Sequence, residues 1–179
     1  MVYVFLANGF EEIEALCVVD FLRRCGICVQ MVSITDEKTV TGSHSIPVVA
    51  DCILTEVDTQ KATAFVLPGG LPGADNLQNC ASLREILTNA NREKRVIGAI
   101  CAAPKVLGAF GILKGRKATC YPGFEEELIG AKALSEPVVC DGHIVTSRGV
   151  ATAPAFAFSL AEALGVNPQK VRTAMLFND

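Results

Sequence analysis

Short apolar segments alternate with longer amphipathic segments along most of the chain. The apolar segments are rich in β-branched and aromatic residues, which is typical of strands buried in a parallel sheet. We predict strands at Val2–Ala7, Val29–Ile34, Ala64–Leu67, Val96–Ile100, Ala118–Tyr121, Pro137–Cys140 and His143–Thr146, with shorter strand pieces and turns between Thr39 and Val57.

The segments between these strands predict helices. They span Glu12–Cys25, Ser82–Arg92, Ala102–Phe110 and Ala153–Leu164. A glycine directly follows three of them, at Gly26, Gly111 and Gly165, as expected where a helix ends. Ser82 is followed three residues later by Glu85, which is the capping-box pattern, so we expect Ser82 to be an N-cap.

This alternation predicts an α/β fold, in which a mostly parallel sheet has helices on both faces. No linker, charge block or internal repeat interrupts the pattern, so we expect a single domain over residues 1–179. Ligands of such sheets bind beyond the carboxyl ends of the strands. The segments to inspect for a site are therefore Asn8–Glu14, Pro68–Gly73, Ile100–Ala103 and Tyr121–Pro122.

Composition narrows the class of protein. Hydrophobic residues make up 50% and charged residues 20% of the chain, which is ordinary for a compact globular protein. The net charge of -3, without a basic run, gives no reason to expect a nucleic-acid or membrane partner. The N-terminus lacks the basic start of a secretory signal, and the eight cysteines are then more typical of reduced thiols. We expect a soluble cytoplasmic protein.

The strongest chemical signal lies around Cys101. The predicted strand Val96–Ile100 leads through this cysteine and two alanines directly into a helix, which is the arrangement of a nucleophile elbow. A thiol at a helix N-terminus feels the positive end of the helix dipole, which favours the thiolate. The alternative is that Cys101 is a small buried hydrophobic residue, as many free cysteines are.

Two further features could assist such a thiol. The glycines of Pro68–Gly73 could direct backbone N–H groups at an oxyanion, although ordinary turn chemistry explains them equally well. Glu14 lies in a mostly apolar helix, where burial would raise its pKa and let it donate a hydrogen bond to a thiolate; the alternative is an exposed acid. His44 and His143 show no ligand-like spacing, so we expect no metal site.

Taken together, these segments resemble the ThiJ/PfpI superfamily, and within it the branch of the parkinsonism-associated protein deglycase. The resemblance runs nearly end to end. It is carried by Gly9–Glu14, Leu67–Gly70, Gly73–Leu77, Ala99–Ala102 and Thr146–Gly149. It implies a flavodoxin-like three-layer sandwich, a homodimer, and catalysis without metal or cofactor.

The resemblance also assigns roles to residues. It implies that Cys101 is the nucleophile and that a protonated Glu14 contacts its thiolate. It places Arg24 near the active site and the dimer contact. It implies that the oxyanion is bound by the amides of Gly69, Gly70 and Ala102.

The chain departs from the pattern of this branch at three positions. Tyr121 stands where the branch often has a histidine, and a phenol with a pKa of about 10 is a poor base near pH 7. A Cys–His pair is therefore doubtful, and catalysis would depend on Glu14. His44 stands where close relatives carry arginine, and Val150 where they often have proline.

These residues allow three functions. The first is a glyoxalase or protein deglycase that converts methylglyoxal to lactate or acts on early glycated proteins, with Cys101 adding to the aldehyde and Glu14 moving a proton between adjacent carbons. The second is a redox sensor or stress-response chaperone that uses the same oxidisable thiol. The third, a cysteine peptidase or amidotransferase, is disfavoured because Ala102 follows the cysteine and neither histidine has suitable spacing.

Overall fold

The computed structural model describes residues 1–177 and contains one seven-stranded sheet. Its strand order is β10-β11-β7-β6-β1-β2-β5, and all neighbours are parallel except the pair β10 and β11. The strands span β1 Val2–Leu6, β2 Val29–Ser33, β5 Cys52–Ile53, β6 Ala64–Leu67, β7 Val96–Ile100, β10 Val138–Asp141 and β11 Ile144–Ser147. Two small sheets pair β3 Thr39–Thr41 with β4 Pro47–Val49, and β8 Lys117–Ala118 with β9 Lys132–Ala133.

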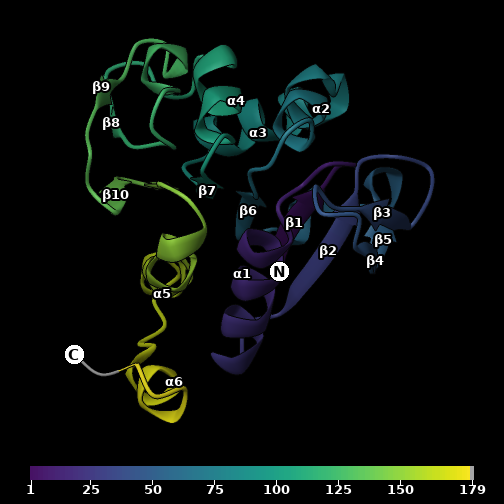
Figure 1. The fold of residues 1–179 in the computed structure, drawn as a ribbon, viewed down its shortest axis with the longest axis vertical. Coiled ribbons are helices and arrows are strands. Elements are labelled where there is room, and N and C mark those ends of the chain that lie inside the picture. The colour runs from purple at the N-terminus through teal and green to yellow at the C-terminus, as the bar shows by residue number, and fades with distance from the viewer. Residues whose placement is uncertain (178–179) are drawn as a thin grey trace.

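Helices cover both faces of the large sheet, as Figure 1 shows. They span α1 Glu12–Arg24, α2 Gly73–Asn79, α3 Ala81–Arg92, α4 Pro104–Ala109, α5 Ala153–Ala163 and α6 Gln169–Ala174. Short 3-10 turns lie at Leu54–Glu56, Thr59–Lys61, Glu125–Glu127 and Val150–Thr152. None of the helices in the described part of the chain is both long and apolar enough to cross a membrane.

The alternation of side chains along β1 builds the three layers. Val4 and its neighbours two residues away point into a core shared with α1 and α5, whereas Phe5 points into a core shared with α2, α3 and α4. Both residues are fully buried. A strand buried on both faces must be apolar throughout, which is the pattern of this segment. The predicted three-layer α/β sandwich is confirmed.

Several predicted elements need correction. The segment Ala118–Tyr121 is not a strand of the large sheet: only Lys117–Ala118 is extended, and it pairs with β9. The chain leaves the extended path because Thr119 N–H donates to the Thr146 hydroxyl and Tyr121 N–H donates to the Cys101 carbonyl. Helix α4 begins at Pro104, after a turn over residues 101–103.

The start of α3 was also mispredicted. Ser82 is not its N-cap, because α2 ends at Asn79, Cys80 is the N-cap and α3 begins at Ala81, which puts Ser82 inside the first turn. The sequence pattern missed α2 and α6 altogether. Helix α2 opens with a glycine and contains two asparagines, and these residues favour turns over helices.

Candidate functional site

Cys101 occupies a strained turn at the carboxyl end of β7. Its backbone has φ of +63°, a left-handed conformation that residues other than glycine seldom adopt. Two hydrogen bonds hold it: Cys101 N–H donates to the Ser147 carbonyl at 3.0 Å, and the Cys101 carbonyl accepts from Tyr121 N–H at 2.9 Å. The expected strand–cysteine–helix elbow is therefore present, and β11 and the 121 loop fix its orientation.

Glu14 reaches the elbow from the first turn of α1. Glu11 caps this helix, because its side chain accepts the Glu14 N–H at 2.6 Å. The Glu14 side chain is fully buried, and its Oε2 accepts the Gly69 N–H at 2.8 Å. Within residues 1–177, its Oε1 has no hydrogen-bond partner. The alternative of an exposed acid is thus wrong.

Burial sets the protonation of this carboxyl. It raises the pKa of Glu14 to about 7, although the Gly69 amide and Cys101 act in the opposite direction. A carboxyl with this pKa exchanges its proton near neutral pH. Glu14 can therefore both accept and return a proton under ordinary conditions.

The electrostatics of Cys101 differ from the expectation of a thiolate. Burial raises the pKa of the Cys101 thiol to about 12, and the negative charge of Glu14 adds to this effect. The amides of Ala102 and Gly70 lower the pKa, but less strongly. The dipole argument fails because the helix begins only at Pro104 and is short. The thiol therefore needs a base at the moment of reaction, and Glu14 is beside it.

The two glycines assigned to oxyanion binding have different environments. The Gly69 N–H is occupied by Glu14, so Gly69 holds the carboxyl and is not free to bind an oxyanion. A Cβ on Gly69 would lie 2.6 Å from the Cys101 Cβ and 2.7 Å from the Glu14 Oε2, so no larger residue fits. The Gly70 amide faces the sulfur together with that of Ala102. These two amides are therefore the candidate donors to an oxyanion.

The loop before α1 and the loop after β6 meet backbone to backbone. Glu11 N–H donates to the Gly69 carbonyl at 2.9 Å, and Gly73 N–H donates to the Gly9 carbonyl at 3.2 Å. A Cβ on Gly9 would lie 2.4 Å from Pro72, and one on Gly70 would lie 2.5 Å from the Glu11 nitrogen. We call this contact the glycine seam. It joins the segment that carries Glu14 to the segment that faces the thiol.

A cavity of about 580 Å³ lies over Cys101 and opens to solvent. Loops at the carboxyl ends of several strands form it, as expected for such a sheet. Its lining residues are Glu11, Glu14, Gly70, Cys101, Tyr121, Pro122, Arg148, Gly149, Val150, Ala151 and Thr152. Sequence reasoning placed Tyr121 here correctly. It did not predict that residues 148–152 line the cavity, although the motif Thr146–Gly149, which carried part of the family resemblance, overlaps this segment.

Arg24 and His44 lie outside this cavity lining. Arg24 is at the far end of α1, about 15 Å along the helix from Glu14, and its Nε pairs with Asp20 at 2.7 Å. The Nδ1 of His44 lies 2.7 Å from the Glu12 Oε2, and its backbone N–H donates to Oε1. Although burial acts in the opposite direction, these bonds lower the pKa of Glu12 to about 2.

Among the described residues, the group that could chelate a metal comprises Glu11, Glu12 and His44, whose ligand atoms lie within 4.8 Å of one another. The carboxylates already accept backbone N–H groups of Glu14 and His44. They also sit at the positive end of α1, which disfavours a cation. This arrangement fits a capped helix better than a metal centre.

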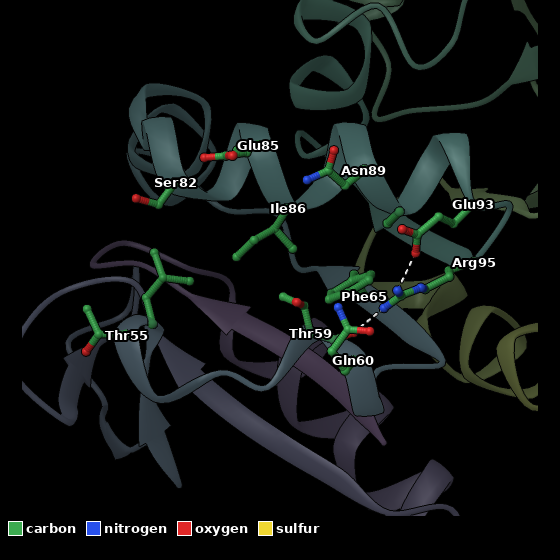
Figure 2. Close-up of a pocket in the computed structure, with 12 residues that line it drawn as sticks. Thr55, Thr59, Gln60, Phe65, Ser82, Glu85, Ile86, Asn89, Glu93 and Arg95 are labelled. Carbon is green, nitrogen blue, oxygen red and sulfur yellow. Dashed lines mark hydrogen bonds and ion pairs between the residues drawn. The ribbon is translucent and has the colours of Figure 1, made fainter.

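A second cavity, of about 350 Å³, lies between α3 and the turns that precede β6 (Figure 2). Arg95 lies at one end of it, paired with Glu93 and donating to the Thr59 carbonyl. Its lining contains neither a cysteine nor a histidine. Neither Cys101 nor Glu14 lines it, so the cavity over Cys101 is the candidate site.

Comparison with known proteins finds relatives that are similar over most of this chain. "Protein DJ-1 homolog B" of Arabidopsis thaliana is 40% identical over 89% of this chain, but this match covers only 37% of its own length; for homolog A the share is 41%. "Glutathione-independent glyoxalase DJR-1.2" of Caenorhabditis elegans is 34% identical over 92% of this chain and 88% of that protein.

Solved structures agree with this relationship. "Toxoplasma gondii DJ-1, oxidized" superimposes with a TM-score of 0.93 at 34% identity, covering 98% of this chain and 97% of that one. The Drosophila melanogaster DJ-1beta structure gives 0.92 at 34% identity, with coverage of 98% and 96%. The sequence profile of the DJ-1/PfpI family matches residues 1–163. The chain therefore belongs to the DJ-1/PfpI family.

Proposed function

We propose that this protein is a cofactor-independent cysteine enzyme of the glyoxalase and protein deglycase type, which converts methylglyoxal to lactate and acts on early dicarbonyl adducts of proteins. The observation that carries the proposal is a fully buried carboxyl, with a pKa of about 7, beside a thiol at the base of an open cavity. The relative named as a glutathione-independent glyoxalase supports the same reaction class.

The first step forms a carbon–sulfur bond. Glu14 accepts the proton of the Cys101 thiol as the sulfur adds to the aldehyde carbon, so that the sulfur never has to ionise alone in its buried position. The carbonyl electron pair moves to oxygen, which then takes the proton from Glu14, so that the hemithioacetal carries a hydroxyl and Glu14 is again a carboxylate. This oxygen lies near the amides of Gly70 and Ala102, which face the reacting sulfur.

The second step is an internal oxidation and reduction. Glu14 removes the proton from C1 of the hemithioacetal and returns a proton to C2, while a second proton passes from the C1 oxygen to the C2 oxygen. The aldehyde carbon becomes a thioester and the ketone carbon becomes an alcohol. Water then hydrolyses the thioester, which releases the 2-hydroxy acid and the Cys101 thiol. The phenol of Tyr121 takes no proton in these steps.

Removing the thiol tests the proposal directly. Cys101→Ala should abolish conversion of methylglyoxal to lactate, because no covalent hemithioacetal can form. Cys28→Ala is the matched control, since Cys28 is an exposed thiol remote from the cavity lining, and it should retain full activity. Lactate is measured enzymatically at initial rate. Normal lactate formation by Cys101→Ala would refute the proposed cysteine-dependent activity.

A redox role at the same thiol is a second candidate. Cys101 is partly exposed beneath an open cavity, and one structural relative is described as an oxidized DJ-1. The raised pKa of Cys101 acts against rapid oxidation, since peroxide reacts with the thiolate. Peptide mass spectrometry after mild peroxide treatment decides the matter: a sensor requires Cys101 to gain oxygen faster than the exposed Cys28.

We also propose a cytoplasmic homodimer. Exposed apolar side chains lie on α1 at Ile13 and Leu16, and on the β3–β4 hairpin at Ile46 and Val49. A second copy would remove them from water. All eight cysteines are free, which suits a reducing compartment. Light scattering coupled to gel filtration tests the dimer, and a monomeric mass at micromolar concentration would refute it.

A further inference from the structure

The outer wall of the Cys101 cavity is formed by apolar side chains that remain accessible to a ligand. Tyr121 is 51% exposed and Val150 is 39% exposed, although both line the cavity. Pro122 and Ala151 complete this wall. An aromatic ring left half open beside a reactive thiol offers a contact surface that the catalytic steps do not use.

The Tyr121 ring is supported from behind. It makes an edge contact with Phe124, with ring centroids 6.5 Å apart and planes at 76°. The ammonium of Lys105 lies 5.6 Å from the centroid of the Phe124 ring, and Lys105 is itself buried and paired with Asp75 on α2. A Cβ on Gly149 would lie 3.4 Å from the Tyr121 ring. The ring is thus packed between neighbours and does not hang freely in solvent.

The size of the cavity does not match the smallest dicarbonyls. Methylglyoxal carries a single methyl group beyond its two carbonyls, and it would leave most of a cavity of about 580 Å³ empty. When its aldehyde carbon is at the sulfur, a methyl substituent would gain little contact with the wall. A larger apolar substituent would bury the accessible faces of Tyr121 and Val150, and burial of apolar surface favours binding.

We propose that Tyr121 and Val150 make this site selective for 2-oxoaldehydes with an aromatic or branched apolar substituent. The inference rests on the proposed function and names its substrate class. Phenylglyoxal is the probe for such a substrate. The bonds change as described for methylglyoxal: the sulfur adds to the aldehyde, a proton moves from C1 to C2, and water releases mandelate.

The test compares initial-rate kcat/KM for phenylglyoxal with that for methylglyoxal. The parent should prefer phenylglyoxal, and Tyr121→Ala should lower the phenylglyoxal-to-methylglyoxal ratio about tenfold or more, chiefly through KM. Tyr121→Phe is the matched control, because it keeps the ring and removes only the hydroxyl, and it should retain the parental ratio. A parent that prefers methylglyoxal, or a ratio unchanged in Tyr121→Ala, would overturn the proposal.

A second measurement separates this inference from the proposed function. If neither aldehyde is converted, the enzyme proposal fails, and the apolar preference is then decided by alkylation of Cys101 with phenacyl bromide or bromoacetone. Each rate is divided by that of the exposed Cys28 in the same protein, which removes the intrinsic reactivity of the reagent. Cys101 should favour the phenacyl reagent, and Tyr121→Ala should lose this preference. Equal normalised rates in the parent would refute the selectivity.

Discussion

Glu12 and Glu14 lie two residues apart in the same helical turn, yet their surroundings give them opposite properties. Glu12 meets the β3–β4 hairpin, where hydrogen bonds from His44 lower its pKa to about 2 despite burial. Glu14 meets β6 and the thiol, where burial raises its pKa to about 7 with one amide as partner. The balance between burial and the hydrogen-bond donors around a carboxyl therefore decides whether it stays charged or exchanges protons.

The largest expected difference between the two acids is in catalysis. Glu14→Gln should reduce the conversion of methylglyoxal about 10²- to 10⁴-fold, because the amide cannot accept the thiol proton. Glu12→Gln should cost less than about tenfold, because the Glu12 side chain does not line the cavity. Steady-state lactate formation measures both variants. Equal losses would show that the whole turn, and not the single carboxyl, supports the reaction.

The second contrast is the pH dependence of folding. Since the pKa of Glu14 rises from 4.5 to about 7 on folding, its protonation favours the folded state at low pH. This contribution is lost as the pH rises from about 4.5 through 7. Between pH 5 and pH 8 the parent should therefore lose about 2 to 3 kcal/mol of stability relative to Glu14→Gln. Urea unfolding at several pH values measures this difference, and parallel pH curves would contradict it.

Glu12 should behave in the opposite sense. Its pKa falls from 4.5 to about 2 on folding, so its stabilising effect is present above pH 4.5 and is lost as the pH falls toward 2. In the same urea series, the free energy of unfolding should therefore fall less between pH 4.5 and pH 2 in Glu12→Gln than in the parent. Glu14→Gln serves as the control here, because it should leave the change in unfolding free energy below pH 4.5 as it is in the parent.

The smallest effect is expected at His44. Its pKa is raised by the Glu12 carboxylate, so the charged pair stabilises the protein below the ordinary histidine pKa of 6.5 and fades as the pH rises beyond the raised value. His44→Gln should therefore lower the Tm slightly at pH 5.5 and less at pH 8.5. Scanning calorimetry at the two pH values tests this. An equal decrease at both would point to packing instead of charge.

The sequence singled out Cys101 and Glu14 as candidate site residues because each carries a local signal. Cys101 stands between a β-branched strand and two alanines before a proline, and Glu14 is an acid within an apolar helix. Both signals depend on near neighbours in the chain, which is the information that periodicity and turn chemistry provide. The elbow and the positions of the main strands along the chain could therefore be anticipated, whereas the residues around Glu14 left an exposed acid open and only the family resemblance placed it at the thiol.

The errors arose where distant segments decide the outcome. Gly69 was expected to bind an oxyanion, but Glu14, 55 residues away in sequence, occupies its amide. The cavity wall at residues 148–152 follows β11, which pairs with β7, and no local pattern reveals that neighbour. Arg24 was placed near the site by resemblance, although the length of α1 separates it from Glu14. Contacts between segments far apart in the chain determine these positions, and the periodicity of the sequence carries no information about such contacts.

The glycine seam fixes the position of Glu14 relative to Cys101 through the backbone, so this position does not depend on the side chains nearby. Peptide groups alone make its hydrogen bonds, and no Cβ stands between the two loops. Residues of the cavity wall that lie outside the seam, such as the 39% exposed Val150, can therefore be exchanged to alter what enters, while the spacing of Cys101 and Glu14 stays unchanged. New specificities on this scaffold are accordingly accessible by surface substitution, with the seam itself kept invariant.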